Sequence, residues 1–132
     1  MILNHSIKKP INEVYNSIAD VELFVKFHPV VYKAEKIGEN EYVFYEKIKL
    51  LFIPIPIKYK VILLELNPNK SIKMFSEVQK GVYLNLKFSF IPTPEGTGVV
   101  EEVEVKASFL VKLVFQMILK RVHKNWFKNI AN

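Results

Sequence analysis

Three histidines and the absence of cysteine limit the chemistry that this chain could perform. The histidines are His5, His28 and His123, and they fall on three different predicted elements. No two of them are three or four residues apart, as paired metal ligands on one helix would be. Without cysteine there is no thiolate ligand and no thiol nucleophile. The four glycines all fall in predicted turns, so no phosphate-binding loop is present. The sequence therefore predicts neither a metal site nor a cofactor.

A serine nucleophile finds no support either. A triad with serine and histidine would have to use Asp20, the only aspartate, or a glutamate as its acid. Nothing in the spacing places such an acid beside a serine and a histidine. The sequence therefore leaves any catalytic residue unassigned.

Two glutamates stand out because they share a face with apolar residues. Glu101 is in phase with Val99, Val103 and Val105 along a predicted strand. A buried carboxylate is costly unless it is paired, and burial raises its pKa. Glu101 is then either a polar anchor or general acid/base in a cavity, or an acid that reaches solvent or pairs with a lysine. The same alternatives apply to Glu46, which shares a face with a phenylalanine and an isoleucine.

His28 closes a short predicted helix, because the residue before a proline avoids the α region. Two roles remain open for it. It binds a ligand at the mouth of a cavity, or its ring caps backbone carbonyl groups.

Periodicity divides the chain into strands and helices. A short strand at 2–7 precedes a helix at 10–19, which begins at Pro10, and a second short helix that Asp20 caps. From Val30 onward the apolar residues recur with period two, as in strands. Six further strands are predicted, separated by turns and starting near residues 30, 42, 58, 71, 82 and 99.

The last segment, from Phe109 to about Ile130, is long enough to be a helix and contains neither glycine nor proline. Its first half is apolar nearly all round, with only Lys112 and Gln116 as polar breaks, which predicts burial on most sides. It also carries five of the basic residues and no acid, whereas the preceding 108 residues are nearly balanced. That asymmetry indicates either an anionic partner or a solvated helix face. The aromatic residues of this helix have packing roles, so nucleic-acid binding is not predicted.

These elements predict an α+β fold in one domain, residues 1–132. About seven strands form a curved antiparallel sheet, in the order β-α-α-β6-α, wrapped around the long C-terminal helix. Such a helix-grip arrangement leaves a space for a small molecule between sheet and helix. No signal peptide and no membrane-spanning run is found, and the chain lacks cysteine, so we expect a cytoplasmic protein.

Two stretches resemble the START-like (SRPBCC) superfamily, which includes Bet v 1-like, coenzyme Q-binding-like and polyketide cyclase/dehydrase-like proteins. They are HSIKKPINEVYNSIADVELFVKFHP at 5–29 and EGTGVVEEVEVKAS at 95–108, which leads into the long helix. The resemblance covers essentially the whole chain. It implies the helix-grip fold with a hydrophobic cavity, and it carries over no catalytic motif, since fold does not determine function.

The stretch FIPIPI at Phe52–Ile57 is apolar on both sides and contains two prolines, which remove hydrogen-bond donors from a sheet. It lies in an uncharged run from Leu50 to Ile57, and we expect a loop there. Three roles remain open: a lid over the cavity, transient contact with an anionic membrane surface together with the basic C-terminal helix, or a homodimer contact.

The leading functional hypothesis is the binding, or transport, of a hydrophobic small molecule or lipid. Ten apolar residues are predicted to line the cavity, with His28 and Glu101 as polar anchors; the ten are Phe24, Phe27, Phe44, Leu84, Leu86, Phe88, Val103, Val105, Val114 and Met117. One alternative is a cyclase/dehydratase-type enzyme acting on a polyketide-like substrate. The other is a protein-interaction module with a packed, ligand-free core.

Overall fold

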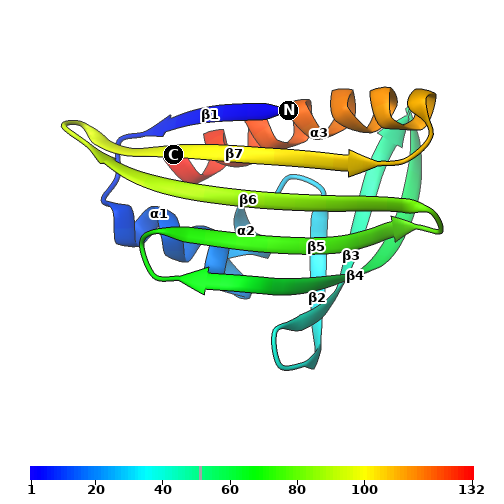
Figure 1. Cartoon of the computed structure of the whole chain (residues 1–132), viewed down its shortest axis with the longest axis horizontal. Coiled ribbons are helices and arrows are strands. Elements are labelled where there is room, and N and C mark those ends of the chain that lie inside the picture. Colours follow the sequence, from blue (N-terminus) through cyan, green and yellow to red (C-terminus); the bar gives the residue numbers. More distant parts are fainter. Residues whose placement is uncertain (51) are drawn as a thin grey trace.

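A computed structural model describes residues 1–50 and 52–132. In this part of the chain, seven strands form one antiparallel sheet in the order β1-β7-β6-β5-β4-β3-β2 (Figure 1). The strands are β1 (Ile2–Ile7), β2 (Val31–Gly38), β3 (Glu41–Leu50), β4 (Ile53–Asn67), β5 (Ser71–Gln79), β6 (Val82–Thr93) and β7 (Gly96–Lys106). The helices are α1 (Ile11–Ala19), α2 (Val21–Phe27) and α3 (Phe109–Ala131). The predicted helix-grip architecture is confirmed.

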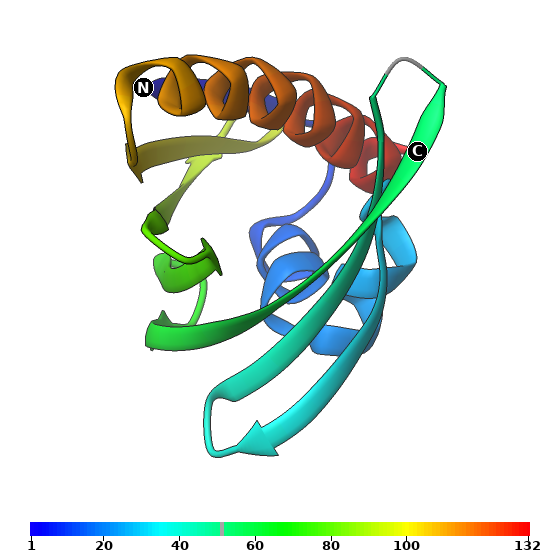
Figure 2. The ribbon, with the colours of Figure 1, turned by 90° about the vertical axis from the view of Figure 1, so that its right-hand side faces the viewer.

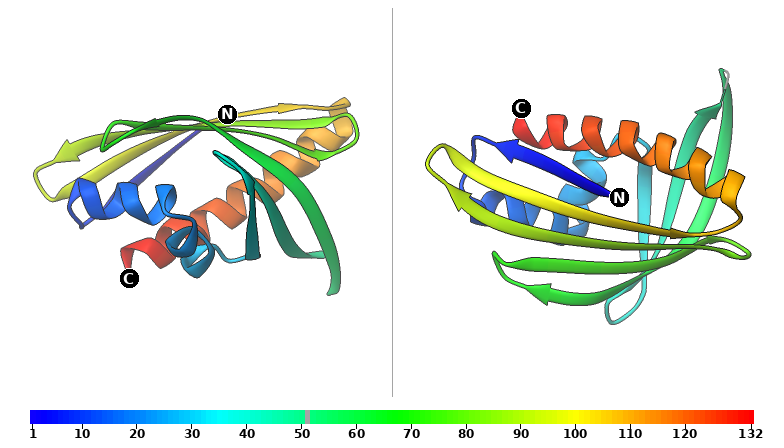
Figure 3. Two further views of the ribbon diagram at one scale, coloured as in Figure 1. Left: turned by 90° about the horizontal axis from the view of Figure 1, so that it is seen from below. Right: turned by 45° about the horizontal axis from the view of Figure 1, so that its top comes forward.

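The sheet curves strongly, and α3 runs along its open side, with α1 and α2 closing one end (Figures 2 and 3). Helix α3 contacts β1 and β7 on one side and α2 near its own C-terminal half. The β3–β4 hairpin projects at the other end of the molecule, where α3 begins, but its tip and the first turns of α3 are well separated (Figure 3, left). One end of the molecule is therefore closed by helices, and the other is bordered by a hairpin and a helix start.

Local sequence accounts for the positions of the helix ends. Pro10 directly precedes α1, where its missing N–H leaves no helix hydrogen bond unmade. The Asp20 carboxylate accepts hydrogen bonds from the N–H groups of Glu22 (2.9 Å) and Leu23 (3.2 Å), as expected for an N-cap. Ser108 occupies the N-cap position of α3 with extended backbone angles, but its side chain makes no capping bond.

The loop predicted at Phe52–Ile57 is wrong. Ile53 to Ile57 form the start of β4 and pair with β3, for example Ile55 with Ile48. Phe52 lies in the turn with a φ of 72°, a left-handed conformation that is uncommon for residues other than glycine. Its side chain is 96% exposed. Leu51, in the middle of the uncharged run, lies outside the described residues.

The two prolines fit this strand because they face an edge without a pairing partner. The N–H of Leu63 in β4 donates to the carbonyl of Asn40, just before β3 (2.8 Å). Hydrogen-bonding directions alternate along an antiparallel strand, so the even-numbered residues Pro54 and Pro56 turn away from β3. Strand β5 pairs with β4 only from Lys60 onward. The missing N–H groups therefore break no ladder bond and protect the open edge.

The burial predicted for the first half of α3 is also wrong. Phe109, Leu110, Val111, Leu113 and Val114 are all exposed, although each is apolar. In the second half, by contrast, Trp126 and Ile130 are completely buried in the core.

Candidate functional site

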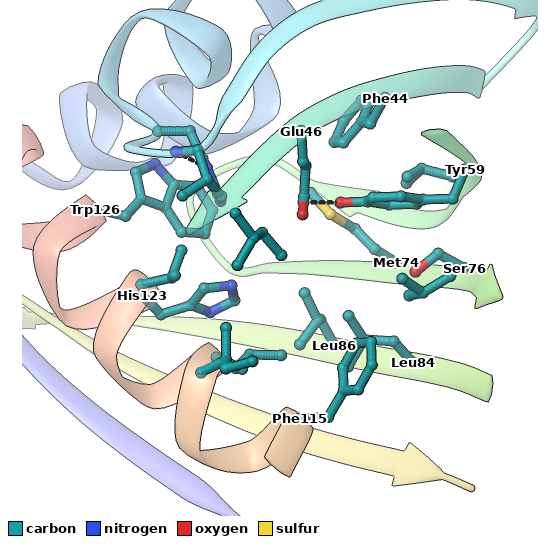
Figure 4. Close-up of a pocket in the computed structure, with 18 of the residues that line it drawn as sticks. Phe44, Glu46, Tyr59, Met74, Ser76, Leu84, Leu86, Phe115, His123 and Trp126 are labelled. Carbon is teal, nitrogen blue, oxygen red and sulfur yellow. Dashed lines mark hydrogen bonds between the residues drawn. The ribbon is translucent and has the colours of Figure 1, made fainter. Parts of the chain in front are cut away.

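A cavity lies between the concave face of the sheet and α3 (Figure 4). Its volume is about 70 Å³. The lining comes from α2 and the loop after it, from β3 to β6 and from α3. The lining residues are Phe24, His28, Val30, Phe44, Glu46, Ile48, Tyr59, Val61, Met74, Ser76, Val78, Leu84, Leu86, Phe115, Ile118, Leu119, Val122, His123 and Trp126.

Five of the twelve residues predicted to contact a ligand line this cavity. They are Phe24, His28, Phe44, Leu84 and Leu86. Leu84 and Leu86 alternate along β6 toward the concave face, and Phe24 packs against Phe44 with ring centroids 5.0 Å apart. The strand periodicity therefore identified the correct face at these positions.

The structure places the other seven predicted residues elsewhere. Phe88, Glu101, Val103 and Val105 are buried without lining the cavity, and Phe27 is half-buried against the core. Val114 and Met117 lie on the outer side of α3, exposed by 50% and 73% respectively. The prediction that Val114 and Met117 line the cavity is therefore wrong. This half of the helix is apolar nearly all round, so the sequence did not indicate which side faces outward.

Glu101 is completely buried and holds two histidines from distant parts of the chain. Its Oε1 lies 3.1 Å from Nε2 of His5 on β1, and its Oε2 is hydrogen-bonded to Nδ1 of His123 on α3. The His5 ring also stacks on Phe127, with centroids 3.7 Å apart and planes within 7°. Neither solvent nor a lysine satisfies this carboxylate; two imidazole rings do.

The charge of this cluster follows from its partners. Burial by itself would raise the pKa of Glu101, but the charge of His123 and the hydrogen bonds from His123 and His5 outweigh it and hold the pKa below its ordinary value. Glu101 is therefore a carboxylate at neutral pH. Each imidazole donates an N–H to it, which places the His123 proton on Nδ1 and leaves Nε2 turned toward the cavity.

His28 has a backbone role, but not the one predicted. Its Nδ1 accepts hydrogen bonds from the N–H groups of Val30 (3.3 Å) and Val31 (3.1 Å), so it caps donors rather than carbonyls. Burial, and next the charge of His123, lower the pKa of His28 well below its ordinary value. The ring is neutral, carries its proton on Nε2 and lines the cavity.

Glu46 and Tyr59 form a second polar pair in the lining (Figure 4). They lie on the neighbouring strands β3 and β4, two residues apart in register, and the Tyr59 hydroxyl donates to the Glu46 carboxyl group. Burial raises the pKa of Glu46, although the hydrogen bond from Tyr59 and the charge of His123 oppose the rise. Burial, followed by the nearby Glu46, raises the pKa of Tyr59 well above its ordinary value. This wall of the cavity therefore favours uncharged groups.

Trp126 supplies a donor with no partner. Its indole Nε1–H is buried and makes no hydrogen bond within the described residues. The ring packs between Phe24, His28 and His123, at centroid distances of 4.7, 4.9 and 5.2 Å. An unsatisfied buried donor costs about 1–3 kcal/mol, so this N–H is a place where a ligand acceptor would be favoured.

Sequence reasoning missed His123, Tyr59, Ser76 and Trp126 as lining residues. For His123 a signal existed: it is four residues after Leu119 and three before Trp126, on the buried stripe of α3. A histidine on a buried stripe needs a buried hydrogen-bond partner, just as Glu101 does on the apolar face of its strand. Tyr59 and Ser76 alternate with other concave-face residues, but their strands carry too little periodicity to separate them from surface positions.

Two further observations concern other kinds of site. In the described part of the chain, no group of three or more histidine, aspartate or glutamate side chains is arranged to hold a metal ion. Among the helices at 1–50 and 52–132, none is both long and apolar enough to cross a membrane.

Comparison with known proteins gave matches to solved structures only. No protein-family profile and no curated protein sequence matches the chain. The di-domain ARO/CYC StfQ from the steffimycin biosynthetic pathway superposes with a TM-score of 0.78 at 11% identity, covering 99% of this chain and 48% of StfQ. The chain thus spans about half the length of StfQ.

Two solved proteins of similar size show the same likeness. CV1439 from Chromobacterium violaceum has a TM-score of 0.78 at 14% identity, covering 100% of this chain and 97% of that one. A conserved protein from Geobacillus kaustophilus has a TM-score of 0.75 at 17% identity, covering 98% and 90%. At these identities the likeness establishes the fold alone: the chain has the helix-grip fold that its sequence predicted.

Proposed function

We propose that the protein binds an apolar small molecule or lipid in the cavity, with a hydrogen-bond acceptor such as a carbonyl oxygen at the ligand's inner end. The observation that carries this proposal is the composition of the cavity wall. Most of it is aliphatic or aromatic, and its few polar groups lie on opposite walls, with His123 and Trp126 on α3 and Glu46 and Tyr59 on β3 and β4. Three of them, on Trp126, His28 and Glu46, favour forms that donate hydrogen bonds.

The size of the cavity bears on how the ligand is seated. Small-molecule pockets commonly measure about 300–1,000 Å³, and the cavity here is far smaller, at about 70 Å³. A ligand of ordinary size therefore requires side chains of the lining, such as the half-buried Ile48 and Phe115, to move apart.

The ligand enters from an anionic lipid surface. Exposed apolar residues lie at two places toward the open end of the molecule, with Phe52 and Ile53 on the hairpin and Leu110 and Met117 on α3. Basic residues lie near both places: Lys112 is on the first half of α3, and exposed lysines follow β3 and β4. Apolar insertion flanked by basic residues suits a membrane surface that contains acidic lipids.

Ligand binding is tested by native mass spectrometry of the protein purified without detergent, with organic extraction of whatever is bound. We expect a mass increment that disappears on denaturation. The variant Leu86→Trp should abolish it, because the larger ring fills the cavity, at a stability cost of about 1–3 kcal/mol.

The matched control is Tyr83→Trp, which adds a similar ring on the outer face of the same strand, where the side chain is exposed. It should retain the bound mass. An increment equal in both variants would contradict binding in this cavity, and a protein that remains free of ligand after incubation with a lipid extract would contradict the proposal as a whole.

An enzyme of the cyclase/dehydratase type is a second candidate. It is favoured by the fold shared with the ARO/CYC StfQ and by the buried pairing of His123 with Glu101 beside the cavity. The third alternative, a protein-interaction module with a fully packed core, is disfavoured by the presence of the cavity.

A further inference from the structure

We infer that His123 is a general base that removes a proton from the carbon next to the carbonyl group of a bound ketone, and that Glu101 positions it. The inference rests on the proposed function, because it requires a carbonyl ligand in the cavity. It adds a chemical step that binding alone does not need. The geometry of three buried groups carries it.

The His123 ring has a defined orientation and a defined tautomer. Its Nδ1 is hydrogen-bonded to Oε2 of Glu101, so the neutral ring carries its proton there and has its lone pair on Nε2. His123 lines the cavity, and its ring points into it (Figure 4). A carboxylate that fixes the tautomer of a histidine and stabilises its protonated form is the arrangement that makes imidazole an effective base.

Glu101 is itself fixed. His5 binds its other oxygen at 3.1 Å and is held in place by stacking on Phe127. The carboxylate is completely buried, so no water competes for either oxygen. A structural ion pair would not need this second histidine; its effect is to prevent the carboxylate from rotating away from His123.

An acid lies on the opposite wall. Glu46 reaches the cavity from β3, facing the α3 wall that carries His123 (Figure 4). Burial raises its pKa, which favours the protonated carboxyl group. Tyr59 holds one of its oxygens. A base and an acid thus approach the same space from two sides, as keto–enol chemistry requires.

The proton transfer balances without any further reactant. Nε2 of His123 takes the proton from the α carbon, and the electron pair of that C–H bond forms a C=C bond. The carbonyl π pair moves to oxygen, which takes the proton of Glu46. The products are an enol, an imidazolium ion paired with Glu101, and a Glu46 carboxylate. Reversal of these steps with an exchanged proton returns the ketone.

The pH dependence involves the groups that face His123 from each neighbouring element. These are Glu101 on β7, with His5 behind it on β1, and Glu46 on β3; the His28 ring lies 6.0 Å away, beyond the end of α2. Only neutral His123 acts as a base. At higher pH the rate should fall as Glu46 ionises.

The test uses acetophenone in D2O, with proton NMR to follow exchange of its methyl protons for deuterium. We expect the protein to accelerate exchange by about 10²-fold over buffer, the lower end of what general acid–base catalysis contributes. His123→Gln should abolish the acceleration. Glu101→Gln should reduce it by about 10-fold or more, while Asn125→Ala, on the exposed side of the same helix, should have no effect.

Saturation-transfer NMR on the same samples separates the two proposals. If acetophenone binds to the wild type and is lost from Leu86→Trp, but no exchange is accelerated, the base assignment is overturned and the binding proposal stands. If acetophenone does not bind at all, the binding of carbonyl ligands is contradicted and the inference fails with it. Acceleration that persists in His123→Gln also overturns the inference.

The tautomer of His123 can be measured on the wild-type protein, so this test does not depend on whether the variants fold. The ¹⁵N chemical shifts of the imidazole nitrogens report which one carries the proton. We expect neutral His123 to be protonated on Nδ1, and folded Glu101→Gln to lose that preference. A proton on Nε2 in the wild type would leave no lone pair facing the cavity, and would overturn the inference.

Discussion

At the scale of the residue, burial acts in opposite directions on the acids and bases of the cavity. It raises the pKa of Glu46 and lowers that of His28, so in both cases it disfavours the charged form. Glu101 is also buried, yet two imidazole partners keep its pKa low. The carboxylate that is stabilised by partners therefore lies outside the cavity lining, while burial disfavours charge on the polar groups within it.

The raised pKa of Glu46 means that its ionisation opposes folding. The favourable contribution of its proton is complete below the ordinary pKa of 4.5 and is lost as the pH rises through the folded-state value. Glu46→Gln, which keeps a polar group for Tyr59, should therefore stabilise the protein at pH 8 by something on the order of 1 kcal/mol. Urea unfolding of both proteins at pH 4 and pH 8 measures this.

At pH 4 the two proteins should be nearly equally stable, because Glu46 is then protonated in both states. The exposed Glu39→Gln serves as control and should change little at either pH. A Glu46→Gln variant that is less stable than the wild type at pH 8 would show that the carboxylate is favourable where it lies, contrary to the direction assigned to its pKa.

At the scale of the element, the two halves of α3 differ both in composition and in surroundings. Apolar periodicity predicts which side of a helix is buried only when a polar side exists for comparison. From Phe109 to Leu119 there is none, so the sequence could not show that this half extends past the curved sheet. The two prolines of β4 led to the wrong prediction of a loop, because the sequence does not show that this part of the strand has one unpaired edge, where prolines are tolerated.

This division predicts very different costs for substitutions two residues apart. Met117→Ser should change the free energy of unfolding by less than about 0.5 kcal/mol, because the side chain is exposed. Leu119→Ala should cost about 2–5 kcal/mol, because that side chain is buried in the core and borders the cavity. Chemical denaturation of the two variants measures both changes in the free energy of unfolding. Comparable changes at the two positions would mean that the first half of α3 packs against another surface in solution.

At the scale of the molecule, the sequence predicted the order and type of nearly all the elements, and with them the cavity. It could not predict which polar groups meet. Glu101 is 96 residues from His5 and 22 from His123 along the chain. Their contact depends on the register of β1 with β7, which pairs Leu3 with Glu101, and on the rotation of α3 about its axis. Neither quantity is determined by local periodicity.

The open end of the molecule predicts association with acidic lipid surfaces. The protein should sediment with vesicles of phosphatidylcholine and phosphatidylserine, and less with pure phosphatidylcholine, because each lysine near an anionic surface contributes about 1 kcal/mol. Binding should weaken as salt is added. Phe52→Ser should reduce binding, because it removes the most exposed aromatic ring of the hairpin.

Ile37→Ser is the matched control. Ile37 is an exposed apolar residue at the end of β2, next to the start of β3 and therefore far from the β3–β4 turn. It should leave vesicle binding unchanged. If vesicles do not bind, and size-exclusion chromatography instead shows a dimer that Phe52→Ser dissociates, the apolar end is a contact between two copies and the membrane proposal is wrong.

The position of Trp126 has a consequence for how the site can be observed. It is the only tryptophan in the sequence, and it lines the cavity between two histidine rings. Indole emission is sensitive to the polarity around the ring and is quenched by a protonated imidazole in contact with it. Tryptophan fluorescence of this protein therefore comes from the wall of the cavity, and it should change, without a label, when the polarity there changes.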